Sequence, residues 1–268
     1  KIVAGEAIRR FFKMAQQSTV WKRFSSSRDQ RPILIVGPGG TGKTALAKIL
    51  SIDPDQSARR EDDFVKYVES LSIEKYHDKV RDTDLIVLPG QSRHKLKLDD
   101  YYSQIEKGEF RGIIFVSSYG YHSISIGLES HAVYESGVQQ FRKDYPEYCR
   151  KLEIERIAEI GSCLSDVAEN RTWLLSVVTK QDLWWGHRKS AEKFYRSEEY
   201  ASAIPSGNGR ILHEICFLSL IISNLVDANK KVIANTVAGY DTLKQSESLV
   251  SFLECLSRVL DWETRNNA

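Results

Sequence analysis

The sequence predicts an α/β domain in which a mainly parallel sheet is flanked by helices. Five short apolar runs are typical of buried parallel strands, and segments with helical spacing of apolar residues alternate with them. Of the 268 residues, 41% are hydrophobic and 28% are charged, which supplies enough apolar side chains for a sizeable core. This composition excludes a collagen-like, disordered or disulfide-stapled chain, so we expect one folded domain with an insertion.

The expected elements follow from these patterns. Strands are predicted at 32–37, 85–88, 112–117, 173–178 and 213–223, with a further strand near 66–75. Helices are predicted at 44–50, 97–107, 146–168, 188–197 and 243–262. A turn at Asn229 predicts that residues 232–237 pair back as a hairpin.

The chain divides into an N-terminal segment, residues 1–30, and a domain over residues 31–268. Residues 6–24 have the pattern of a basic amphipathic helix, which we expect to pack on the domain body. Its Arg and Lys residues also allow contact with a membrane surface or a docking partner, which is not the favoured interpretation. Residues 118–145, rich in Tyr, Ser, His and Gly, are expected to form an irregular insertion.

Charge and cysteine usage exclude several classes of function. Lys and Arg total 38 against 36 acidic residues, and basic residues are scattered, so no nucleic-acid partner is predicted. The apolar run at 215–226 is too short to span a bilayer, and no signal peptide is evident. The four cysteines are widely spaced and the histidines lack metal-site spacing, so we expect a cytoplasmic protein with reduced thiols.

The most specific motif is GPGGTGKT at residues 37–44, which fits G-x-x-x-x-G-K-[ST] between an apolar strand and a helix. Glycines let backbone N–H groups wrap a phosphate chain, and the helix directs its positive end at the same oxygens. Lys43 would add a charge to the β- and γ-phosphates, and the Thr44 hydroxyl would ligate Mg²⁺. The fold is therefore predicted to be that of a P-loop NTPase. The residues predicted to hold the phosphates are Gly37, Pro38, Gly39, Gly40, Thr41, Gly42, Lys43, Thr44 and Ala45.

A second motif, TKQD at residues 179–182, follows an apolar strand and resembles the guanine-recognition motif of Ras-like (TRAFAC-class) GTPases. The Asp182 carboxylate can accept from both N1–H and the exocyclic amine of guanine, a donor pair that adenine lacks. The resemblance implies that the stem of Lys180 lies over the base and that Thr179 ties this loop to the phosphate loop. A polar turn with Asp182 as a helix N-cap is the alternative.

A third segment, residues 85–91, resembles the strand end at which that family has D-x-x-G-Q. Gly90 matches the glycine that contacts the γ-phosphate, and Gln91 matches the glutamine that positions the attacking water. Val87 stands in place of the aspartate that supports Mg²⁺, and no Thr lies between Thr44 and Thr83 to sense the γ-phosphate. Both departures predict slow hydrolysis.

A fourth family feature is a Ser-Ala loop behind the base. Ser202-Ala203 matches the Ser-Ala sequence but no strand precedes it, whereas Ser223 follows a predicted strand. We therefore assign Ser223 to this loop. Two aromatic segments each have two possible roles. Residues 119–123 are either a partner loop or a lid near the phosphates, and Trp184-Trp185 either flank the base or pack in the core.

The resemblance, spread over residues 33–224, implies a Ras-like GTPase domain that binds GTP or GDP with Mg²⁺. Its expected reaction is attack of water on the γ-phosphate, with Lys43 stabilising charge and Gln91 orienting the water. Such a protein is expected to serve as a regulatory switch or assembly module with a protein partner. Two alternatives stay open: a P-loop ATPase, for which the spelling GPGGTGKT is also typical of AAA+ enzymes, and a pseudo-GTPase that holds nucleotide structurally.

Overall fold

The computed structural model describes residues 30–51, 74–78, 83–90, 95–135, 137–165, 171–205 and 210–266. Several predictions lie outside these residues and stay predictions. They concern the helix over 6–24, the part of the 66–75 strand that precedes residue 74, and the side chain of Gln91.

The core of the molecule is a six-stranded sheet with the order β2-β3-β1-β4-β5-β6. Only β2 runs antiparallel to its neighbour, and the other strands are parallel, as the buried apolar runs predict. The strands are β1 Ile33–Val36, β2 Glu74–Asp78, β3 Thr83–Val87, β4 Gly112–Ser117, β5 Thr172–Val178 and β6 Ile211–Phe217. Every residue of β1, β4 and β5 is buried, because helices cover both of their faces.

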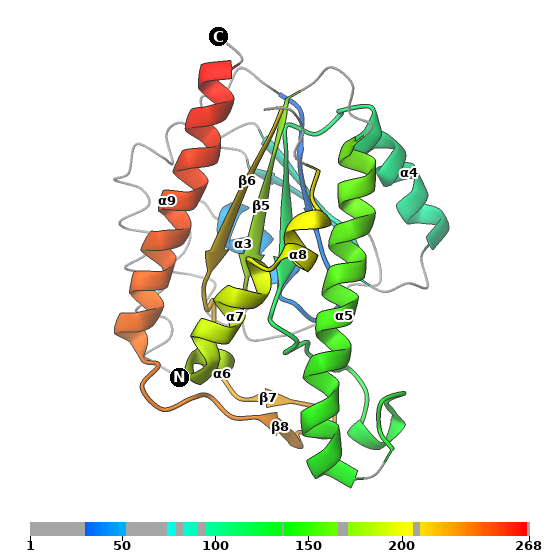
Figure 1. Cartoon of the computed structure of the whole chain (residues 1–268), viewed down its shortest axis with the longest axis vertical. Coiled ribbons are helices and arrows are strands. Elements are labelled where there is room, and N and C mark those ends of the chain that lie inside the picture. Colours follow the sequence, from blue (N-terminus) through cyan, green and yellow to red (C-terminus); the bar gives the residue numbers. More distant parts are fainter. Residues whose placement is uncertain are drawn as a thin grey trace.

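Two layers of helices cover the sheet (Figure 1). One face is packed by α3 and α9, and the other by α4, α5, α7 and α8. The helices are α3 Lys43–Ser51, α4 Lys95–Glu106, α5 Gly137–Ser165, α6 Gln181–Trp184, α7 Arg188–Tyr195, α8 Glu198–Ser202 and α9 Thr242–Asn266. Among these described helices, none combines the length and the apolar character needed to cross a membrane. The mainly parallel α/β fold with flanking helices is thus confirmed.

Helix α5 begins earlier than predicted, because residues 137–145 belong to it rather than to the insertion. The prediction placed its start at residue 146, from the helical spacing of the apolar residues that follow. Pro146 lies inside the helix instead. Phe141 and Tyr145 stack with ring centroids 5.0 Å apart and are both buried, so apolar packing extends the helix by more than two turns before the proline.

The extended end of α5 supports a small lobe, which we define as residues 118–135 with the hairpin formed by β7 (Leu225–Val226) and β8 (Val232–Ala234). The predicted hairpin is confirmed, but its strands pair with each other in a separate two-stranded sheet. A separate apolar cluster, including Leu128, fills the lobe. In Figure 1 the arrowheads of β5 and β6 point toward the end of the molecule where β7 and β8 lie. The lobe therefore adjoins the carboxyl edge of the sheet, where folds of this kind bind ligands.

Candidate functional site

The predicted phosphate loop connects β1 to α3 and has the backbone that its glycines allow. Gly40 and Gly42 have φ of +73° and +99°, values that a residue with a Cβ rarely adopts. A Cβ at Gly37 would lie 2.1 Å from the carbonyl oxygen of Val116, so the loop packs directly on β4. The Lys43 ammonium donates to the carbonyls of Gly37 and Pro38 at 2.9 and 2.7 Å, which places its charge inside the loop.

Gly90, at the end of β3, lies against the phosphate loop. A Cβ at Gly90 would lie 2.2 Å from the amide nitrogen of Gly39, so only glycine allows this approach. The Leu88 amide donates to the Ile35 carbonyl at 3.0 Å and holds the end of β3 beside β1. Val87 is 3% exposed and packs in the core, so no carboxylate stands at the position where the family has aspartate.

The 179–182 loop is joined to the phosphate loop by hydrogen bonds from two of its side chains. The Thr179 hydroxyl contacts the carbonyl oxygens of Thr41 and Ser117 at 2.5 and 3.0 Å. The Lys180 ammonium donates to the Gly40 carbonyl at 2.6 Å. The tie between Thr179 and the phosphate loop, predicted from the resemblance, is therefore present. The two motifs are separated by more than 130 residues in the chain, and the fold brings them into contact.

Lys180 has an unusual backbone and an unusual electrostatic environment. Its φ is +58°, in the left-handed region, at the turn between β5 and α6. The ammonium also donates to the Tyr121 carbonyl at 2.7 Å and to the Ser123 hydroxyl at 2.8 Å. Burial lowers the pKa of Lys180 to about 7, although Asp182 and Glu153 favour the charged form. Three oxygen acceptors thus surround the ammonium of a partly buried side chain.

Asp182 is buried, and both of its carboxylate oxygens are occupied. The Ser219 hydroxyl donates to Oδ1, and the Ser223 amide donates to Oδ2 at 3.0 Å. Burial raises the pKa of Asp182, and the bond from Ser219 opposes that shift. The alternative role as a helix N-cap does not hold, because Asp182 lies within α6. The carboxylate is instead held in a fixed orientation by residues that follow β6.

Ser219 is the residue of the candidate site that sequence reasoning missed. Strand β6 ends at Phe217 rather than at residue 223, and Leu218, whose carbonyl accepts from the Gln181 amide, is the last residue held beside the end of β5. The Ser219 hydroxyl therefore lies behind Asp182, whereas Ser223, which was predicted to lie in the loop behind the base, has an exposed side chain and contacts Asp182 through its amide. The signal in the sequence was the polar Ser219 itself, inside an apolar run that was predicted to be one strand.

Two further predicted segments have clear places. Ser202 ends α8 and its hydroxyl donates to the Glu199 carbonyl, so Ser202-Ala203 does not form the loop behind Asp182. Residues 119–123 do approach the phosphate loop, since the Ser123 amide donates to the Gly40 carbonyl at 2.9 Å.

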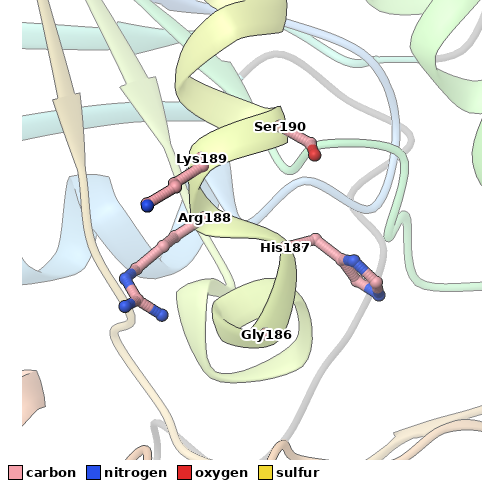
Figure 2. Close-up of a pocket in the computed structure, with 5 residues that line it drawn as sticks. All are labelled: Gly186, His187, Arg188, Lys189 and Ser190. Carbon is pink, nitrogen blue, oxygen red and sulfur yellow. The ribbon is translucent and has the colours of Figure 1, made fainter.

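The two tryptophans that follow Asp182, Trp184 and Trp185, have different environments. Trp184 is fully buried and its ring N–H donates to the Thr179 carbonyl at 2.9 Å, which confirms core packing for this residue. Trp185 is half-buried and lies edge-on to Tyr240, with the Arg188 guanidinium over its indole. A small surface pocket lined by residues 186–190 follows, where Arg188 and Lys189 project to one side (Figure 2). All five lining residues are exposed, and none belongs to the predicted site.

The donor set for a metal ion is sparse. No group of three His, Cys, Asp or Glu residues that could hold a metal is found among the described residues. Asp84 is exposed near the amino end of β3, at the far end of that strand from the phosphate loop. A cation here would depend on the Thr44 hydroxyl, on water and on the phosphates of the bound nucleotide.

Comparison with known proteins gives one family match. Residues 28–120 match the family model of the signal recognition particle receptor beta subunit. No curated protein matches the chain.

The similar solved structures are all distant. The small COPII coat GTPase SAR1 from Encephalitozoon cuniculi in complex with GDP is 13% identical, with a TM-score of 0.47, over 98% of this chain and 90% of that one. The signal recognition particle receptor SRb-GTP/SRX complex from Chaetomium thermophilum is 14% identical, with a TM-score of 0.45, over 73% of this chain and 93% of that one. A GTP-binding protein from Sulfolobus solfataricus in complex with GDP is 13% identical, with a TM-score of 0.36, over 91% of this chain and 57% of that one.

The phosphate loop, the parallel α/β sheet that carries it and the family match over residues 28–120 agree with one another. The chain has the α/β fold and phosphate loop of a P-loop NTPase and is similar over residues 28–120 to the signal recognition particle receptor beta subunit family.

Proposed function

We propose that this domain binds GTP and GDP at the carboxyl edge of its sheet, between the phosphate loop and the 179–182 loop. One observation carries the proposal: Thr179 and Lys180 donate hydrogen bonds to the backbone of the phosphate loop. This contact sets the phosphate-binding motif and the guanine-reading carboxylate in one site. A shared site is what a nucleotide with a base at one end and phosphates at the other requires.

The phosphate end of the site is formed by backbone groups and one cation. The glycines at 37, 40 and 42 leave room for an anion beside the loop, and the amino end of α3 adds its positive partial charge. Lys43 then exchanges its contacts with the Gly37 and Pro38 carbonyls for contacts with the β- and γ-phosphates. The amides through Ala45 complete the cradle.

The base end depends on the orientation of Asp182. Ser219 and the Ser223 amide hold its two oxygens, and each oxygen keeps a further lone pair with which to accept from guanine. Adenine presents an acceptor at N1 and only a C–H at C2, where guanine presents N1–H and its exocyclic amine, so it offers the buried Asp182 carboxylate no donor pair. That difference predicts a preference for GTP over ATP.

Magnesium would be held by the Thr44 hydroxyl together with the nucleotide phosphates. When bound, Mg²⁺ neutralises charge that develops on the transferred phosphate group. The buried Val87 offers no carboxylate to support it. The residues that the structure describes therefore offer fewer protein ligands for the ion than the family resemblance implies.

Hydrolysis of GTP to GDP and phosphate follows from the same assignment, at a slow rate. Lys43 and the loop amides stabilise negative charge on the γ-phosphate, Gly90 approaches it from β3, and Gln91 orients the attacking water.

Val87 favours a second candidate function, a pseudo-GTPase that holds nucleotide as a structural ligand. In either case the domain serves as a switch or assembly module for a protein partner, in the cytoplasm.

The test is displacement of a fluorescent GTP analogue by unlabelled GTP and ATP, with Mg²⁺ present, followed by phosphate release. We expect GTP to displace the analogue at a concentration at least tenfold lower than ATP, and the Lys43→Ala variant to bind neither. Equal displacement by ATP would overturn the assignment of Asp182 and leave a P-loop ATPase as the function. Binding without phosphate release would select the pseudo-GTPase over the enzyme.

A further inference from the structure

A fully buried carboxylate, Glu153, lies on α5 at the back of the site. Its Oε1 accepts from the Ser118 and Gly120 amides at 2.9 and 3.1 Å and from His122 Nε2 at 2.9 Å. Its Oε2 accepts from the Tyr195 hydroxyl at 2.7 Å. Burying a carboxylate is costly unless donors surround it, and these four donors compensate that cost. Glu153 therefore fixes the conformation of the segment that follows β4, residues 118–123.

This segment supports both halves of the candidate site. The Ser123 amide donates to the Gly40 carbonyl, and a Cβ at Gly40 would lie 2.4 Å from the Ser123 carbonyl oxygen. The Lys180 ammonium donates to the Tyr121 carbonyl and the Ser123 hydroxyl. The phosphate loop and the base-reading loop thus rest on one short segment. Glu153 holds that segment from behind.

The donor pattern around Glu153 requires a charged acceptor rather than any side chain of its size. The Tyr195 hydroxyl accepts from the Tyr119 amide at 2.8 Å, so its own proton must be donated to Glu153. A glutamine at this position would keep one acceptor oxygen, but its amide group would turn N–H donors toward that hydroxyl. Burial lowers the pKa of His122, which favours its neutral form, while Glu153 opposes that shift.

We propose that Glu153 is a positioning residue for nucleotide binding, which acts through residues 118–123 on the phosphate loop and Lys180. The inference rests on the proposed function and extends it to α5, a helix that carries none of the predicted nucleotide contacts. Glu153 touches no nucleotide itself. Its effect on affinity passes through the backbone of the segment that it holds.

The experiment compares Glu153→Gln with Ile157→Ala in the same chain. Ile157 is a fully buried residue on the same helix, one turn further on, and its apolar side chain can accept no hydrogen bond from residues 118–123. Both variants lose thermal stability, so binding of a fluorescent GTP analogue is measured well below the unfolding temperature of each. We expect Glu153→Gln to lose about tenfold or more in affinity, while Ile157→Ala binds as the wild type does.

A double variant tests the route of the effect. Lys180→Met removes the ammonium that the segment holds, so adding Glu153→Gln to it is expected to cost less affinity than Glu153→Gln alone. If Glu153→Gln does not fold, Tyr195→Phe removes one donor to the carboxylate and is expected to weaken binding in the same direction. Wild-type affinity in these variants, or an equal loss in Ile157→Ala, would overturn the inference while leaving nucleotide binding in place. A wild-type chain that binds no nucleotide would overturn the proposed function together with this inference.

Discussion

At the scale of single residues, the candidate site contains two buried carboxylates, Asp182 and Glu153, and each of their oxygens accepts at least one hydrogen bond. Asp182 accepts hydrogen bonds from Ser219 and from the Ser223 amide. The charged group that favours its ionised form is Lys180, in the same loop. Burial makes such a group sensitive to any change in its donors, because an unpaired polar atom there costs more than one in water. Replacing one carboxylate oxygen of Asp182 should therefore have a measurable effect on nucleotide affinity.

Replacing Asp182 by asparagine tests base recognition. The amide keeps one acceptor oxygen but presents N–H donors where guanine also presents donors, so GTP affinity should fall by about tenfold to a hundredfold. ATP affinity should stay unchanged. Competition of both nucleotides against the fluorescent analogue measures the two values, and Asp144→Asn on α5 is the control for loss of one surface charge. An equal loss for ATP would show that Asp182 supports the fold rather than reads the base.

His213 offers a second test, on stability and pH. Its Nε2 hydrogen-bonds to the Ser176 hydroxyl at 2.9 Å, and burial lowers the pKa of His213 to about 4. Between about pH 6.5 and pH 4 the unfolded chain binds a proton that the folded chain does not. The free energy of unfolding should therefore fall as the pH falls through this window, by up to about 3 kcal/mol.

Urea unfolding of the wild type and of His213→Gln at pH 7 and pH 4 isolates this effect from the titration of carboxylates. The wild type should lose more stability than the variant between the two pH values. Parallel losses in the two proteins would show that His213 titrates normally in the folded state.

At the scale of elements, the pairing of β4 with β5 depends on a glycine. Gly112 lies opposite Trp173 in the parallel register, and the indole covers the space above it. A Cβ at Gly112 would lie 2.0 Å from the Trp173 ring, whose side chain is fully buried. The two strands therefore constrain each other's residues at this point in the sheet.

Gly112→Ala should lower the free energy of unfolding by about 1–3 kcal/mol, because the buried indole cannot move away. Chemical denaturation measures the loss, and Gly186→Ala is the matched control, since a Cβ there would lie 3.5 Å from its nearest neighbour. Combining Gly112→Ala with Trp173→Phe should cost less than the sum of the two single changes. Strict additivity would show that the ring and the new methyl group do not meet.

At the scale of the whole molecule, the lobe closes the carboxyl edge of the sheet on the side of the 179–182 loop. Asp227 joins its two parts, because its buried carboxylate accepts from the Leu128 amide at 2.9 Å and from the Lys231 amide at 2.7 Å. A surface ion pair between Lys231 and Glu129 lies beside it. Exposed pairs of that kind contribute little, so the buried carboxylate is the main polar link.

Asp227→Ala should loosen the lobe without unfolding the sheet. The buried Leu128 amide and the partly buried Lys231 amide lose their acceptor, which costs up to about 1–3 kcal/mol each and favours local opening. Hydrogen exchange should accelerate in residues 124–134 and in β7 and β8, and stay unchanged in β4 and β5. Glu198→Ala, an exposed change on α8, is the control, and faster exchange throughout the sheet would contradict an independent lobe.

The resemblance of residues 179–182 implied the contact of Thr179 with the phosphate loop. The sequence by itself determined the phosphate loop and the parallel strands at β1, β3, β4 and β5. These depend on local patterns, in which glycines permit a backbone and apolar runs require burial on both faces. Only the tertiary structure decided that Ser219 rather than Ser223 stands behind Asp182 and that α5 continues through Pro146. Only the tertiary structure placed Glu153 beneath residues 118–123. The physical reason is that these outcomes depend on contacts between segments far apart in the chain, where packing overrides local propensity and leaves no periodic signal.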